Sequence, residues 1–470
     1  MKNALLLIML FSAFCFAQNK QILYGFSDIP QTLLLNPGAN VNQSWHVGMP
    51  LLSHLHINAG TSKLTVYDLF ADDNVDFNAK LENAIYSLNN KDFFTATQQL
   101  EILSGGFAFG PTYQKDKYLS FGWYQETDFI AYFPEDYAIL AYEGNVNNTN
   151  RVFNIEDLSF KSELLSVFHI GFNKKVNNKL TYGIRGKIYS SLANITSTSN
   201  KGEVITRTGT NNLLSHTFNL NMAVKTSGVS SLLNDDNSNV SEDISTLSER
   251  LLFGGNLGLG VDFGFTYQID KQWYADASIT DIGFINHKKD VENYELKGTY
   301  VYEGVDPLFP DPAGGTADNY WSEVEEDFEE LFKVDTTTTS YTTLRPVKFN
   351  ASLNYAFGKR RLKSCDCLQE NNGYINKVGA QLYAIKRPEA PQLALTTYYY
   401  RRLFNGFDAK ATYTIDSYSF NNLGLGVSAN VYGLNIYAMA DNLLNFKNIY
   451  DARSVSLQFG INYIFSKNEN

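Results

Sequence analysis

The sequence predicts an all-β fold, a transmembrane antiparallel outer-membrane β-barrel of about 14 strands, with about 16 as the upper count. Three observations support this fold class. Long segments alternate apolar and polar residues, a secretory signal precedes them, and no later run is apolar enough for a membrane-spanning helix. Aromatic residues make up 14% of the chain, and barrels place such rings at both membrane interfaces.

Residues 1–17 are predicted to be a cleavable signal peptide. Lys2 supplies the positive charge, an apolar run extends to Phe14, and the small Ala17 precedes the expected cut. This run is too short to span a bilayer as a helix, which needs about 20 residues. Lipid attachment at Cys15 is the alternative, but the large Phe14 before it disfavours a lipoprotein signal. Export predicts an outer-membrane location for the mature chain.

The segment 454–465 shows the clearest strand alternation. Strand side chains point to opposite sides, so alternate residues form two faces. The apolar face holds Val455, Leu457, Phe459, Ile461, Tyr463 and Phe465, and the polar face holds Ser456, Gln458, Gly460 and Asn462. Segments 218–224, 257–267 and 422–431 repeat this pattern, with a polar side rich in Gly and Asn. We therefore expect a small, polar inner face that lines a lumen or packs against an inserted plug.

Alternation alone also fits an exported β-sandwich, so further features decide between the two folds. The signal peptide and strands of about 10 residues favour the barrel. Short turns are predicted at 176–179, 269–272, 404–406 and 432–433. Asn405-Gly406 is a strong hairpin signal because both residues tolerate positive φ. Barrels of this type keep their short turns on the periplasmic side.

Two regions interrupt the strand pattern. Residues 63–92 predict two short helices with polar caps, placed inside the lumen or at its periplasmic mouth, with a small surface cap as the alternative. Residues 305–343 form the longest interruption, in which Pro and Gly precede an amphipathic acidic helix. Its apolar face holds Val324, Phe328, Leu331 and Phe332. We expect these residues to act as a lid over the pore or as partner contacts, or to form a solvated surface helix.

Catalytic and metal-binding signals are weak. The formal net charge of −11 argues against nucleic-acid binding, and the sequence has no nucleophile elbow, zinc-protease motif or phosphate-binding loop. We therefore expect no enzyme, no cofactor and no metal. His54 and His56 share a strand face, yet such a pair without further ligands is more often two interface or lumen residues. Cys365 and Cys367 are expected as free thiols in a turn, with a strained disulfide or a metal pair as alternatives.

Residues 25–38 (GFSDIPQTLLLNPG), 47–52 and 280–285 (TDIGFI) resemble an uncharacterised Bacteroidota outer-membrane β-barrel family. The resemblance covers most of the mature chain. Asn36-Pro37 is also similar to the N-terminal segment of long-chain fatty-acid transporters and of barrels associated with type IX secretion and gliding. Those proteins usually have Ala where this chain has Gly38.

The resemblance implies a plug-like segment at residues 18–44, followed by a barrel over 45–466. Asn36 and Pro37 would then be plug or gating residues, because similar transporters hold this segment inside the barrel. The family has no settled activity to carry over, but the small, polar inner face favours a channel or transporter for a small, hydrophobic ligand, embedded in outer-membrane lipid. The alternative is a non-catalytic accessory barrel that docks proteins of a secretion or gliding complex.

Overall fold

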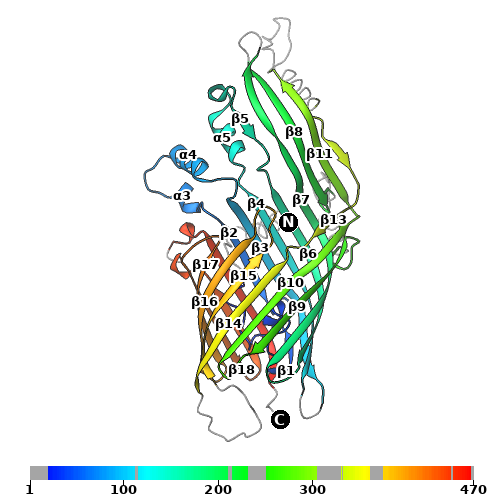
Figure 1. The fold of residues 1–470 in the computed structure, drawn as a ribbon, viewed down its shortest axis with the longest axis vertical. Coiled ribbons are helices and arrows are strands. Elements are labelled where there is room, and N and C mark those ends of the chain that lie inside the picture. The colour runs from blue at the N-terminus through cyan, green and yellow to red at the C-terminus, as the bar shows by residue number, and fades with distance from the viewer. Residues whose placement is uncertain are drawn as a thin grey trace, which may run out of the picture.

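The computed structural model describes residues 20–111, 115–209, 214–230, 250–303, 330, 332–359, 374–445 and 448–466. Within these residues the chain forms a closed antiparallel barrel of 14 strands, which confirms the predicted fold class (Figure 1). The first barrel strand is interrupted, because β1 (Gln43–Gly48) and β2 (Leu55–Thr61) follow each other along the same two neighbours. Pairing of this strand with β20 (Ser454–Ser466) closes the barrel.

The other wall strands pair with their neighbours in chain order. They are β3 (Phe93–Phe109), β4 (Lys117–Tyr132), β6 (Phe160–Lys175), β7 (Leu180–Thr208), β9 (Leu257–Gln268), β10 (Trp273–His287), β14 (Lys348–Lys359), β15 (Tyr374–Ile385), β16 (Gln392–Phe404), β17 (Phe407–Asp416), β18 (Asn422–Val431) and β19 (Leu434–Ala440). The short β13 (Tyr341–Leu344) precedes β14 and pairs with the outer part of β10.

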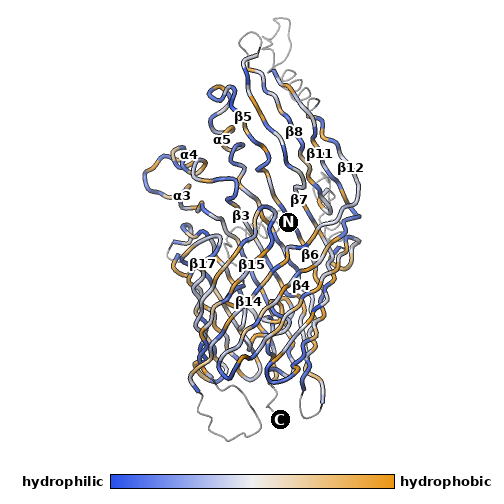
Figure 2. The backbone as a smooth tube through the Cα atoms, viewed as in Figure 1, coloured by the Kyte–Doolittle hydropathy of each residue, from blue (hydrophilic) through white to orange (hydrophobic). Residues whose placement is uncertain are grey.

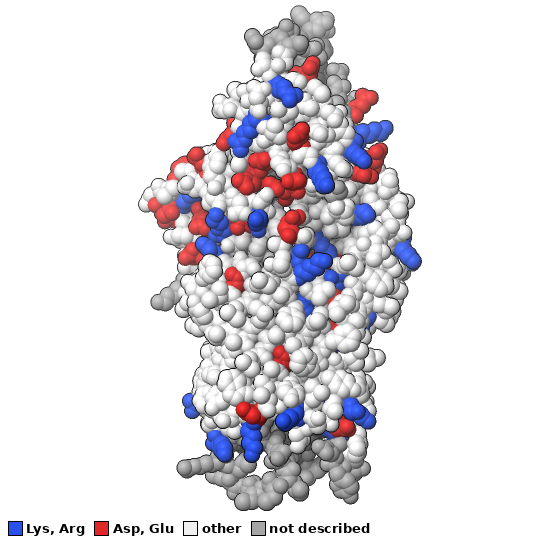
Figure 3. Space-filling view, viewed as in Figure 1, with Lys and Arg blue, Asp and Glu red and all other residues white. Residues whose placement is uncertain are grey.

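The outer face of the barrel is apolar and the inner face is polar, as the alternation predicts. In β20, Leu457 is 47% exposed, whereas the next residue, Gln458, is buried. Figure 2 shows the same alternation of hydropathy along the barrel strands. Lys and Arg gather at the lower end of the barrel and again from mid-height of the molecule upward, and the barrel face between these two regions carries few charges (Figure 3). An uncharged apolar band between two polar ends is the architecture of an outer-membrane protein.

The four predicted short turns lie at one end of the barrel, next to Gln43 and Ser466 (Figure 1). In the turn between β18 and β19, Tyr432 and Gly433 both have positive φ, 51° and 86°. This conformation suits a tight hairpin whose twist matches the strands. By the rule that short turns face the periplasm, this end is periplasmic and the opposite end is the outer end.

A folded head projects from the outer end. Strand β7, 29 residues long, leaves the wall and pairs with β5 (Val152–Asn154) and β8 (Leu214–Ser227). The sheet continues through β11 (Val291–Tyr302) and β12 (Asp335–Thr337), and α5 (Glu135–Glu143) and η1 (Val146–Asn148) lie beside it. The apolar face of 218–224 therefore does not face lipid. Phe218 and Leu220 instead pack in the head core with Ile139 and Phe153.

The predicted helical insert forms α3 (Val66–Phe70) and α4 (Phe77–Ser87). Both helices lie outside the barrel at its outer end (Figure 1), so the predicted place in the lumen or at the periplasmic mouth is wrong. The reason is strand direction: the chain enters β1 at the periplasmic end, so the connection from β2 to β3 must lie at the outer end. None of the described helices is long and apolar enough to cross a membrane.

Candidate functional site

Residues 20–41, called here the inner segment, lie inside the barrel and contact strands from several sides. The segment contains α2 (Thr32–Leu35). The side-chain nitrogen of Gln31 donates to the carboxylate of Glu101 in β3 and to the side-chain oxygen of Asn462 in β20, both at 2.8 Å. On the other side, Ser278 of β10 donates to the Leu35 carbonyl at 2.6 Å. Polar wall side chains therefore satisfy backbone and side-chain groups of a segment that has no strand partner.

Asn36 and Pro37, predicted as plug or gating residues, form a tight turn against β6, β7 and β9. The Asn36 side-chain oxygen accepts from the Gly38 amide at 2.9 Å, and its nitrogen donates to the Phe265 carbonyl at 3.3 Å. Asn173 of β6 donates to the Pro37 carbonyl at 2.8 Å. An Asn side chain that bonds the backbone two residues on is a common device for stabilising a turn.

Two wall glycines face this turn. Gly183 of β7 and Gly264 of β9 are directly paired across the two strands. A Cβ at Gly183 would overlap the Pro37 carbonyl, and a Cβ at Gly264 would overlap the Asn36 side chain. A Cβ at Gly38 would in turn overlap the Gly264 carbonyl. The close approach of two backbones explains why position 38 is glycine.

Two cations hold the first half of the inner segment. The ammonium of Lys410 donates to the carbonyls of Gln21, Ile22 and Tyr24, at 3.3, 3.0 and 2.6 Å. Arg402 forms an ion pair with Asp28. Burial alone would raise the pKa of Asp28, but the guanidinium of Arg402 outweighs burial and holds that pKa below its ordinary value.

An apolar cluster lies between the inner segment and β16 and β19. Phe26 packs edge-on against Tyr400, with ring centroids 5.3 Å apart. The full cluster comprises Ile22, Leu23, Phe26 and Ile29 of the inner segment and Tyr398, Tyr400, Tyr437 and Met439 of the wall. This patch of wall is apolar inside a lumen whose other buried residues are largely polar.

A network of buried ion pairs lies on the inner wall. It joins residues of β7, β9, β10, β14, β4 and β6 and of the loop before β14. Its centre is Asp281, which lies 2.6 Å from Lys187 and 2.8 Å from Lys348. Asp281 has a φ of 61° and sits in a bulge of β10, where the pairing with β9 shifts by one residue. The network continues through Arg185, Asp262, Glu126, Arg345, Glu163 and Lys161. The TDIGFI run that carries the resemblance thus supplies the bulge that turns Asp281 inward.

This network is not among the features predicted from the sequence. The available signal was a set of charged residues on the polar sides of alternating strands, such as Asp262 among the glycines of β9. Alternation places those residues on the inner face but does not say which of them meet across the barrel.

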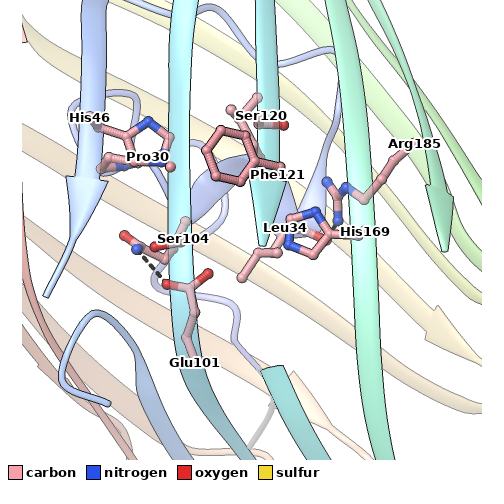
Figure 4. Close-up of a pocket in the computed structure, with 12 residues that line it drawn as sticks. Pro30, Leu34, His46, Glu101, Ser104, Ser120, Phe121, His169 and Arg185 are labelled. Atoms are coloured by element: carbon pink, nitrogen blue, oxygen red, sulfur yellow. Dashed lines mark hydrogen bonds between the residues drawn. The ribbon is translucent and has the colours of Figure 1, made fainter. Parts of the chain in front are cut away.

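A small cavity of about 20 Å³, room for about one water molecule, lies between α2 and the wall (Figure 4). His169 and Arg185 lie beside Leu34 on one side of it, and Glu101 lies with Ser104 on the other. The remaining lining residues are Pro30, Gln31, Leu33, His46, Gly105, Ser120 and Phe121. Apart from this small cavity, the inner segment packs closely on the side facing β3, β4 and β6.

Of the residues predicted as lid or partner contacts, Phe332 is described. It packs on the head, edge-on against Phe218 at 5.0 Å and near Tyr300 at 5.2 Å. Val324, Phe328 and Leu331 lie outside the described residues, as do Cys365 and Cys367.

His54 and His56 lie close together on the inner face, with ring centroids 6.4 Å apart. The Nδ1 atom of His54 is 2.7 Å from the Tyr437 hydroxyl. Within the described part of the chain, no group of three or more His, Cys, Asp or Glu residues is placed to hold a metal ion.

A profile of DUF5723, a family of unknown function, matches residues 37–441. The chain belongs to this family. The matched range of this DUF5723 member includes Pro37, the ion-pair network and the head. A search of curated proteins found no match.

Several solved structures resemble the DUF5723 chain at low identity. The toluene transporter TodX of Pseudomonas putida is 8% identical, with 94% of this chain and 95% of that chain covered and a TM-score of 0.38. A FadL homologue of Pseudomonas aeruginosa is 9% identical, with 92% of each chain covered and a TM-score of 0.39. The CymD monoaromatic hydrocarbon channel is 9% identical, with 93% and 92% covered and a TM-score of 0.38. At these TM-scores the fold assignment rests on the strand pairing of the chain itself.

Proposed function

We propose that the protein is an outer-membrane channel for a small, hydrophobic ligand, with the inner segment as its plug. The observation that carries this proposal is the apolar patch of wall at Tyr398, Tyr400, Tyr437 and Met439. Apolar side chains of a non-covalently held segment now cover that patch. When the inner segment withdraws, the patch becomes a binding site for an apolar molecule of similar size.

The contacts of the inner segment suit a reversible plug. Hydrogen bonds and ion pairs to polar wall groups hold it, and each bond has a modest net free energy of about 1 kcal/mol. In the proposed gating step, the Asn36-Pro37 turn leaves the paired glycines Gly183 and Gly264.

The test is uptake of toluene into lipid vesicles that contain the purified protein. Toluene is the side-chain analogue of phenylalanine, so it matches the space that Phe26 fills against Tyr400. We expect faster uptake than in protein-free vesicles, and a several-fold loss in Met439→Gln, which puts an amide into the patch. Met222→Gln in the head is the matched control and should leave uptake unchanged. Equal uptake with and without protein would refute the channel.

We also infer that the chain is exported by cleavage of residues 1–17, which leaves a plug at 18–44 and a barrel at 45–466. Amino-terminal sequencing of protein from outer membranes should begin at Gln18. A start at Cys15 would contradict this reading and favour a lipoprotein.

A second candidate function is an accessory barrel that docks secretion or gliding proteins. The head favours it, because a folded sheet with its own core outside the barrel offers a protein-binding surface. Purification from native membranes in mild detergent should then retain stoichiometric partners, and removal of 214–227 with its neighbouring strand should release them. A lone barrel in that experiment counts against docking.

A further inference from the structure

The helices α3 and α4, with the loop between them, form an arm at residues 66–87. The arm projects sideways beyond the profile of the barrel wall at the outer end (Figure 1). Its local fold is well determined by capping: Thr65 and Asp68 form a capping box for α3, and Asp76 caps α4. Such a projection places the arm above the lipid that surrounds the barrel.

The arm exposes large apolar side chains that its own fold does not bury. Phe70 is 69% exposed and Phe77 is 49% exposed, and their rings lie 5.9 Å apart. Tyr67 and Val75 are 42% and 50% exposed. Aromatic side chains grouped on the surface of a folded element indicate an apolar environment next to it.

This aromatic surface continues down to the lipid-facing wall. α3 packs against η4 (Ile449–Asp451), which follows η3 (Leu443–Asn445) at the barrel rim. On the rim, Tyr450 is 57% exposed and Leu444 is 54% exposed. Below them, Leu457 of β20 lies in the apolar band of the barrel. The arm therefore extends the exposed apolar surface of the barrel wall.

Four of the five carboxylates of the arm have structural partners, so the acidic loop does not by itself indicate a basic protein partner; Glu82, for example, accepts from the Tyr142 hydroxyl at 3.3 Å. Asp73 forms an ion pair with Lys80 at 2.6 Å, and Asp68 and Asp76 cap the two helices. Tyr86 faces the head and not the side that carries Phe70 and Phe77, since its ring centroid lies 6.5 Å from that of Tyr142 in α5. The two sides of the arm thus differ: one faces the head, and the other carries the aromatic side chains.

We propose that the arm lies on the outer leaflet and inserts Phe70 and Phe77 into the headgroup layer of the lipid. Amphipathic and aromatic surfaces favour this layer, because rings bury apolar area there while their polar neighbours stay hydrated. The arm anchors the outer end of the barrel, and the anchor acts independently of transport through the lumen.

The experiment is site-specific fluorescence quenching in vesicles of phosphatidylethanolamine and phosphatidylglycerol. A bimane dye is attached to Phe70→Cys or Phe77→Cys in full-length protein that carries Cys365→Ser and Cys367→Ser. Tyr86→Cys is the matched control, because it lies on the same arm with a similar exposure of 50% but faces the head. Each protein is titrated with aqueous iodide and with phospholipid that bears a spin label near the glycerol backbone.

We expect the dyes at 70 and 77 to be quenched several-fold more by the spin-labelled lipid than the dye at 86, with the reverse order for iodide. Equal iodide quenching at all positions would overturn the proposal, because the arm would then stand in water. Poor quenching by both agents at 70 and 77 would also overturn it, since a second copy or another protein would cover the arm. Heat-modified mobility on gels checks that each labelled barrel is folded.

Discussion

Substitution of Gly183 by alanine tests whether the paired glycines hold the inner segment in place. The added methyl group would lie 2.8 Å from the Gly38 nitrogen and closer still to the Pro37 carbonyl. Both atoms belong to backbone, so neither can rotate away as a flexible side chain would. The Asn36-Pro37 turn must therefore move off the wall in Gly183→Ala, while the strand pairing of Gly183 remains possible.

The size of the effect follows from the cost of overpacking. Extra methyl groups in a well-packed interior cost about 1–3 kcal/mol. Each ~1.4 kcal/mol is tenfold in an equilibrium constant, so the population with a displaced turn should rise about 5- to 150-fold. The same substitution at Gly186, three residues along β7, meets no atom within 4 Å and is the matched control.

Hydrogen–deuterium exchange at the amides of Leu34, Asn36 and Gly38 measures this population directly. We expect the exchange rates of these amides to rise by the stated factor in Gly183→Ala and to stay at the wild-type value in Gly186→Ala. Amides of the wall strands should not change in either variant. Unchanged exchange at Asn36 in a folded Gly183→Ala barrel would refute the idea that glycine contact fixes the turn.

Three further predictions concern the charges. Lys410→Met removes the donor shared by three inner-segment carbonyls. The free energy needed to open the inner segment should therefore fall by about 1–3 kcal/mol, and hydrogen–deuterium exchange at its first turn should become faster. Asp281→Asn removes one of the two carboxylates that contact each of Lys187 and Lys348 and should lower the free energy of unfolding in urea by about 1–3 kcal/mol; Asp72→Asn on the exposed arm should have no effect. The depressed pKa of Asp28 means that its contact with Arg402 is fully formed above the ordinary value of 3.8 and is lost as pH falls through the lower folded value. Hydrogen–deuterium exchange of amides near Asp28, corrected for intrinsic rates, should therefore become faster as the pH falls below the folded-state pKa of Asp28. Asp28→Asn should abolish this increase.

The sequence predicted the barrel well because alternation responds directly to the two environments of a wall strand. Leu457 and Gln458 differ in exposure for the reason their hydropathy suggests. The same alternation at 218–224 predicts a wall strand, but this segment lies in the head. A head core and a lipid bilayer both favour apolar side chains at every second position. Only the pairing of β8 with the outer half of β7 separates the two cases.

The candidate site was predictable only in part. Asn36-Pro37 could be identified as a turn from local chemistry, but its contact with Gly183 and Gly264 depends on a pairing of β7 with β9 that lies far along the chain. The ion-pair network depends on the bulge at Asp281, since a regular strand would direct neighbouring residues to the opposite face. Register and bulges follow from the closed sheet as a whole, so single-strand patterns do not contain them.

The continuity of β7 has a mechanical consequence. Its 29 residues form one strand from the periplasmic turn to the head, a length of about 95 Å. Near one end, Arg185 donates to the Leu34 carbonyl at 3.1 Å, and near the other, Val204 packs in the head core. No flexible linker separates these points, and bending would concentrate at two register shifts, one at Leu192 and one between Ser197 and Ser199. A sideways force on the head is therefore transmitted through the wall to the inner segment, which couples events outside the cell to the lumen through a single strand.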